Sequence, residues 1–147
     1  MHTVTTWVVL ADAGRARIVE SPGPGKGLSE IAAFDSPSRH DAARDLGSGR
    51  PGRTGDRMGP GRHALEPRHN PKDIATQEFE RALVVHLVES AKRKAFDRLV
   101  VVAPPKVLGD LREMLDGKIA IETTLAKDLV SVATHDLEDH LRAVINF

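Results

Sequence analysis

The first quarter of the chain carries the hydrophobic pattern of β-structure. Three runs rich in apolar and β-branched residues have the length of strands, namely Val4–Leu10, Arg15–Glu20 and Leu28–Phe34. The links between them, Asp12-Ala13-Gly14 and Pro22–Gly27, contain the glycine and proline of tight turns. Three consecutive strands with short links predict an antiparallel meander.

After residue 70 the pattern changes to the period of an α-helix. Asn70 is a suitable N-cap, and Pro71 suits the first helical position. Apolar residues then recur four apart along one stripe, at Phe79, Leu83, Leu87 and Ala91. The spacing predicts a long amphipathic helix packed on a sheet.

Strands and helices alternate in the rest of the chain. Arg98–Ala103 is a continuous apolar run, typical of a central strand covered on both faces. We expect a short helix from Val107 to Gly117, a last strand over Lys118–Thr124, and a final helix capped by Thr134. The order β-β-β-loop-α-β-α-β-α predicts a single α/β domain over residues 1–147, with a mixed five-stranded sheet and helices packed on its faces.

Composition limits the classes of function. The 147 residues have a formal net charge of zero and no cysteine, which excludes disulfides and thiolate metal sites. An anionic partner must therefore be recognised by a local patch of positive charge. No apolar run approaches the roughly 20 residues of a membrane span, and the N-terminus has no basic leader. We expect a cytoplasmic, soluble protein without a membrane span.

Such a patch is present in the segment Ser36–Lys72, whose apolar residues show neither the period of a strand nor that of a helix. It contains eight basic and four acidic side chains, a net charge of +4, together with many glycines and prolines. Loops of this length in compact domains are usually functional or disordered, and arginine forks suit phosphate. A solvated insertion and a subunit contact remain open. The predicted anion- or RNA-binding residues are Arg50, Arg53, Arg57, Arg62, His63, Arg68 and Lys72.

The same segment holds two weaker motifs. Gly47–Gly52 matches G-x-G-x-x-G, but it neither follows a strand directly nor opens a helix, so a dinucleotide site is not expected. His40, His63 and His69 could bind zinc, but they lack the tight spacing of metal ligands. We therefore expect no metal and no cofactor.

A hydrolase would need carboxylates that converge on a metal ion. Asp12 follows the first strand, and Asp35 and Asp97 lie at other strand margins. Asp12 is better interpreted as a turn residue that bonds to the backbone. No catalytic residues are predicted, and the sequence favours a protein that is not an enzyme.

Four stretches together resemble the bacterial host-attachment protein family: Thr6–Ile18, Arg50–Lys72, Phe96–Leu115 and Ala126–Leu129. The resemblance spans nearly the whole chain. It implies a role in the attachment of bacteria to host cells and specifies no chemistry.

The order of elements also resembles the central domain of archaeal and eukaryotic peptide-chain release factors. In that domain a meander leads into a basic, glycine-rich loop with a Gly-Gly-Gln tripeptide, and then into a long helix. This chain has no Gly-Gly-Gln; Gly55-Asp56 and Gly59-Pro60-Gly61 stand in the comparable stretch. The resemblance implies contact with RNA or the ribosome rather than peptide release.

The sequence thus favours a binding module whose arginine-rich segment contacts RNA, the ribosome or another anionic partner. The alternative is a protein–protein interaction factor that supports attachment, and a metal-dependent hydrolase is weaker. A homo-oligomer remains open.

Overall fold

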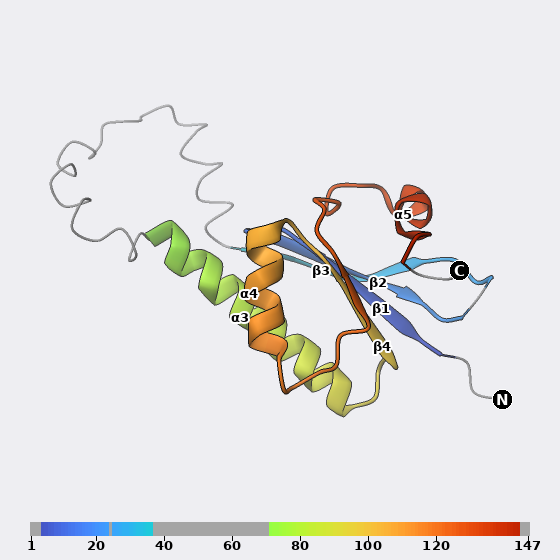
Figure 1. Ribbon diagram of the computed structural model, residues 1–147, viewed down its shortest axis with the longest axis horizontal. Coiled ribbons are helices and arrows are strands. Elements are labelled where there is room, and N and C mark those ends of the chain that lie inside the picture. The colour runs from blue at the N-terminus through green and yellow to red at the C-terminus, as the bar shows by residue number, and fades with distance from the viewer. Residues whose placement is uncertain (1–3, 24, 37–70, 145–147) are drawn as a thin grey trace, which may run out of the picture.

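The computed structural model describes residues 4–23, 25–36 and 71–144, and its centre is a five-stranded sheet (Figure 1). The strands are β1 (Thr6–Ala11), β2 (Arg15–Ser21), β3 (Ser29–Asp35), β4 (Arg98–Val102) and β5 (Thr123–Leu125). The helices in the described residues are α3 (Pro71–Lys92), α4 (Pro105–Leu115) and α5 (Thr134–Leu141). These elements confirm the mixed α/β class and the order predicted from the sequence.

The sheet is mixed, in the order β3-β2-β1-β4-β5. Strand β1 is central: Val8 pairs with Val19 of antiparallel β2 on one side and with Val100 of parallel β4 on the other. Strands β1, β2 and β3 form the expected antiparallel meander. Strand β5 adds in parallel beside β4 and lies at the opposite edge from β3.

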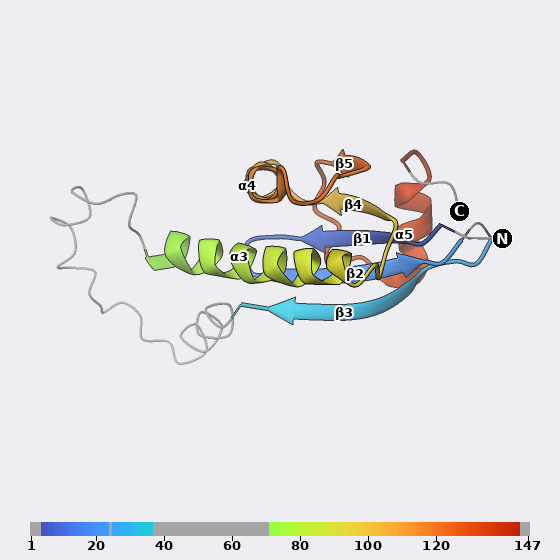
Figure 2. The ribbon, with the colours of Figure 1, turned by 90° about the horizontal axis from the view of Figure 1, so that it is seen from below.

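Helices cover both faces of the sheet. Figure 1 shows α3 and α4 on one side and α5 on the other, and Figure 2 looks onto the face covered by α3 and α4. The residues of β1 explain this arrangement, because alternate side chains enter two separate cores. Trp7 and Val9 pack under α3 and α4, whereas Val8 and Leu10 pack with Leu137 of α5.

A buried arginine connects the sheet to the segment that leads into α5. Arg17 of β2 is 6% exposed, and its Nε donates to Glu30 Oε1 at 2.7 Å. Its Nη1 donates to the carbonyl oxygens of Val130 and Val132, at 2.8 and 2.6 Å, and its Nη2 donates to Thr134 Oγ1 at 2.9 Å. The prediction that Thr134 caps α5 was therefore wrong. Ala133 occupies the N-cap position, and the Thr134 hydroxyl accepts a hydrogen bond from Arg17 instead.

The last strand is shorter than predicted. Residues 118–121 do not pair as a strand, because Gly117, at φ 78°, ends α4 and the N–H groups of Lys118 and Ile119 both donate to the carbonyl of Leu115. Pairing with β4 begins only at Thr123. Ile119 and Ile121 instead pack against the core beneath α4.

Candidate functional site at the carboxyl edge of the sheet

The carboxyl ends of four strands meet at one edge of the sheet. Strands β1, β4 and β5 are parallel, and β3 runs in the same direction because two antiparallel pairings separate it from β1. Helix α4 begins at Pro105, directly after β4, with Pro104 as its N-cap. Open α/β sheets bind ligands beyond the carboxyl ends of their strands, so this edge is the candidate site.

Helix α3 begins beyond the same edge and ends near the amino end of β4 (Figure 2). Its last turn connects closely to β4, with Ala95 N–H bonded to Ser90 O at 3.0 Å and Asp97 N–H to Thr5 O at 2.8 Å. A helix of 22 residues is about 33 Å long, whereas the five residues of β4 span about 17 Å. The N-terminal end of α3 therefore extends past the carboxyl edge, as Figure 2 shows.

The turn between β1 and β2 closes one part of this edge. The Gly14 N–H donates to Asp12 Oδ1 at 2.9 Å, and the Asp12 N–H donates to the Arg15 carbonyl at 2.8 Å. This confirms the interpretation of Asp12 as a turn residue. The Ser36 N–H donates to the Gly14 carbonyl at 2.8 Å, and Ser36 is buried. The end of β3 is thus fastened to the β1–β2 turn.

Of the carboxylates considered for a hydrolase, Asp97 is separated from Asp12 and Asp35 by the length of the strands. Asp12 lies at the carboxyl end of β1, whereas Asp97 precedes β4 and its Oδ2 accepts the Thr5 N–H at 2.8 Å at the other end. Within residues 4–23, 25–36 and 71–144, no group of three or more His, Cys, Asp or Glu side chains could hold a metal ion.

The predicted anion-binding residues lie at or beyond the limit of the described chain. Lys72 belongs to the first turn of α3. The other six, together with the three loop histidines and the G-x-G-x-x-G string, lie outside the described residues: Arg50, Arg53, Arg57, Arg62, His63 and Arg68. What the structure adds is the position of the two flanks of this segment. Ser36 and the start of α3 both belong to the carboxyl edge.

Helix α3 also contains a buried acidic residue that was not predicted from the sequence. Glu80 of α3 is 1% exposed, and among the described residues neither of its carboxyl oxygens has a hydrogen-bond donor. The Asp110 carboxyl of α4 lies within hydrogen-bonding reach, but a second carboxylate supplies no proton of its own. Asp110 in turn pairs with Lys106, whose Nζ lies 3.1 Å from Asp110 Oδ2.

Burial is the main cause of a large pKa shift at Glu80. The pKa of its carboxyl is raised from 4.5 to about 8: burial is the largest cause, the hydrogen bond and charge of Asp110 act in the same direction, and Lys106 opposes them. The sequence held a signal for this residue. Glu80 lies three, four and seven positions before Leu83, Val84 and Leu87, so it falls on the apolar stripe of α3.

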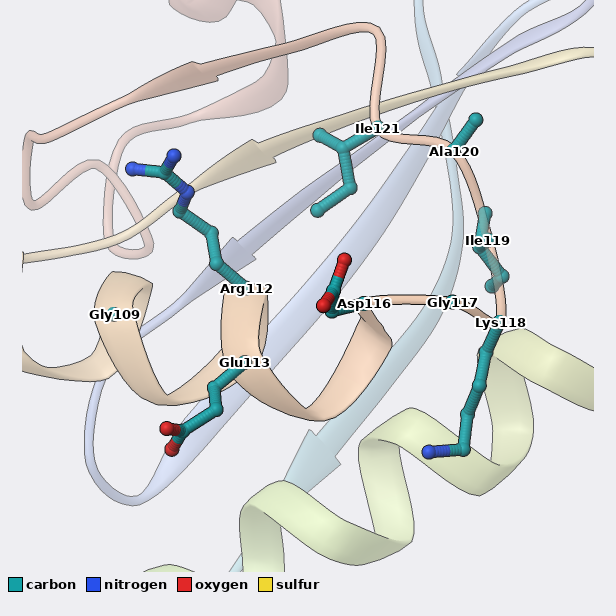
Figure 3. A pocket seen from close by; sticks show the side chains of 9 residues that line it. All are labelled: Gly109, Arg112, Glu113, Asp116, Gly117, Lys118, Ile119, Ala120 and Ile121. Carbon is teal, nitrogen blue, oxygen red and sulfur yellow. The ribbon is translucent and has the colours of Figure 1, made fainter.

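A groove lies on the outer side of α4, in the neighbourhood of the β5 edge. It has a volume of about 830 Å³ and lies between α4 and residues 117–121. Its charged lining is mixed, with Arg112 and Lys118 against Glu113 and Asp116, and Figure 3 shows the two cations extending away from each other. This balance of charge favours no particular ligand.

The architecture defines an α/β protein with a mixed sheet and a basic segment inserted between its meander and its first described helix. The family model described as "Protein required for attachment to host cells" matches residues 7–141, and the chain belongs to this family. It is also 35% identical over 84 residues to an uncharacterized protein of Rickettsia prowazekii (strain Madrid E). That alignment covers 54% of each chain, so this chain spans about half the length of that relative. Among the helices of the described residues, none is long and apolar enough to cross a membrane.

Proposed function

We propose that the protein is a non-enzymatic binding module that presents its segment Ser36–Lys72 to RNA or to another polyanion. The observation that carries the proposal is the position of the two flanks. The Ser36 N–H donates a hydrogen bond to the β1–β2 turn, and α3 begins at Pro71, beyond the same edge of the sheet. A segment with eight basic and four acidic side chains is therefore flanked on both sides by residues at the carboxyl edge of the sheet.

The residue types of the segment suit contact with phosphate. Seven of its eight cations are arginines, and a guanidinium can donate two parallel hydrogen bonds to phosphate oxygens. The segment has no Phe, Tyr or Trp on which unpaired bases could stack. The expected contact is therefore with the RNA backbone, and sequence preference should be weak.

The resemblance to the release-factor central domain supports the ribosome as the place where such RNA would be met. A meander, a basic glycine-bearing segment and a long helix follow one another in both. Because Gly-Gly-Gln is absent, we propose binding at the ribosome without peptide release.

The test is the salt dependence of binding to ribosomal RNA and to intact ribosomes. Each neutralised phosphate of single-stranded RNA contributes about −0.7 to the slope of log K against log salt. The triple variant R53A/R57A/R62A should weaken binding strongly at low salt and reduce the slope by about 2. The matched control R81A/K92A/K127A removes the same charge from exposed positions outside the segment and should leave the slope unchanged. Equal effects of the two variants, or wild-type binding that does not depend on salt, would contradict the proposal.

A second candidate function is a protein–protein interaction factor that supports attachment, and the description of the family favours it. Complementation of a deletion strain with wild type or with R53A/R57A/R62A separates the two. If the variant restores attachment fully while it has lost RNA binding, attachment depends on a protein surface instead.

A further inference from the structure

We propose that Glu80 and Asp110 share one proton across the contact between α3 and α4, and that this contact loosens when the proton is lost. The pair would make the α3–α4 contact a pH-sensitive joint. This inference rests on the described residues and does not depend on RNA binding.

The first step is the isolation of Glu80. Its side chain is 1% exposed, and neither oxygen accepts a hydrogen bond from a described residue. A buried, unpaired carboxylate is costly, and such a group becomes neutral rather than remaining charged. The proton that neutralises Glu80 can also serve as the donor that the geometry lacks.

The second step is the position of the proton. Lys106 Nζ lies 3.1 Å from Asp110 Oδ2, and the Asp110 side chain is 28% exposed. Glu80, by contrast, is 1% exposed, and burial disfavours the charged form of its carboxyl. We therefore place the proton on Glu80, which donates it to the Asp110 carboxylate.

The third step is the surroundings of the pair. The charged groups that act on the Glu80 carboxyl are Asp110 and Lys106, and both belong to α4. The sheet face beneath the two helices contributes apolar side chains, among them Val9 and Val101. With the pKa of Glu80 raised to about 8, chiefly by burial, the shared proton is retained at pH 7 and lost in mildly alkaline solution. Two carboxylates would then face one ammonium, that of Lys106, whose side chain is mostly exposed.

The consequence should be confined to one part of α3. Glu80 lies in the N-terminal half of the helix, whereas Leu83, Leu87 and Ser90 remain buried further along it. Loss of the proton should therefore weaken the packing of the N-terminal half against α4 and leave the C-terminal half in place.

Infrared spectroscopy of the full chain tests the shared proton directly. Wild type at pH 7 should show the band of one protonated carboxyl, which disappears as the pH rises past about 8. The band should be absent from E80Q and retained in E78Q, an exposed glutamate of the same helix. In D110N the amide can donate to Glu80, so the band should titrate at lower pH.

Hydrogen exchange tests the joint. Between pH 6.5 and pH 9, protection of the N-terminal half of α3 should fall in wild type, after correction for the intrinsic pH dependence of exchange. The amide of E80Q donates to Asp110 at every pH, so its protection should stay constant. A wild-type spectrum without a protonated carboxyl at pH 7, or an equal loss of protection in wild type and E80Q, would overturn the proposal.

Discussion

Two ionisable side chains are buried in the described part of the chain, one on each face of the sheet, and their surroundings differ. Arg17 is surrounded by acceptors: one carboxylate, two backbone carbonyls and one hydroxyl. Glu80 accepts no hydrogen bond from a described residue, and the neighbouring Asp110 is another acid. Arg17 thus stabilises the fold, whereas the buried carboxyl of Glu80 destabilises it.

The difference separates a structural role from a candidate functional one. Arg17 joins β2 to carbonyls 113 and 115 residues away and fixes the segment that leads into α5. Stability alone accounts for it. Stability does not account for Glu80, because an apolar side chain of similar volume would pack in the same place without desolvating a carboxyl. Perturbed, buried titratable groups cluster at functional sites, so Glu80 is the stronger candidate for function.

The largest expected effect is the loss of Arg17. Arg17→Ala leaves Glu30 and the carbonyls of Val130 and Val132 without their donor, so we expect a destabilisation of about 3–5 kcal/mol. Urea denaturation of the two proteins measures this change in the free energy of unfolding. Hydrogen exchange should show that residues 129–141 lose protection before α3 does.

Arg15→Ala is the matched control on the same strand. Arg15 is half-exposed, and its ion pair with Asp35 is long, at 3.8 Å, so the loss should stay below about 1 kcal/mol. If both variants lose the same stability, the network around Arg17 does not have the role assigned to it.

Replacement of Glu80 should have a smaller effect of the opposite sign. Because the folded pKa is raised above 4.5, the folded state retains a proton that the unfolded chain has released. Stability is therefore fully present below about pH 4.5, and it declines as the pH rises to about 8. Glu80→Leu removes this decline and should stabilise the protein by about 1–3 kcal/mol at pH 7.

The pH dependence of that gain distinguishes it from ordinary repacking. Urea denaturation at pH 5, 6, 7 and 8 should show the advantage of Glu80→Leu growing with pH. The effect of Arg17→Ala should stay level, because a guanidinium does not titrate in this range. A gain from Glu80→Leu that is independent of pH would mean that the carboxyl is ionised throughout.

The elements could be predicted from the sequence because their signals are local. The apolar stripe and Pro71 gave α3, and the run Arg98–Ala103 gave β4 nearly to the residue. The cap predicted at Thr134 failed because a distant residue competes with the local pattern. Thr134 has the chemistry of an N-cap, but Arg17 binds its hydroxyl from the other end of the chain. A contact between residues so far apart in the chain cannot be predicted from the residues around Thr134.

The candidate site could be predicted only in part, for the same reason. The charge of Ser36–Lys72 is a property of composition and is visible in the sequence. The Glu80–Asp110 pair is 30 positions apart in sequence and depends on how α3 and α4 pack. A glutamate on the apolar stripe could have indicated a buried charge, but nothing local indicated that its neighbour would be another acid.

The smallest expected effect concerns Lys106, and it tests the electrostatic part of the comparison. The Lys106 side chain is 81% exposed, so Lys106→Ala should change stability by no more than about 0.5 kcal/mol. The lysine nevertheless lowers the pKa of Glu80, and its removal should therefore raise that pKa. The decline of stability should then extend to higher pH in the variant than in wild type.

Because salt screens an exposed charge, the two profiles should converge at 1 M salt, whereas Lys127→Ala should match wild type at every salt concentration. A profile of Lys106→Ala displaced toward lower pH would show that Lys106 does not favour the ionised pair.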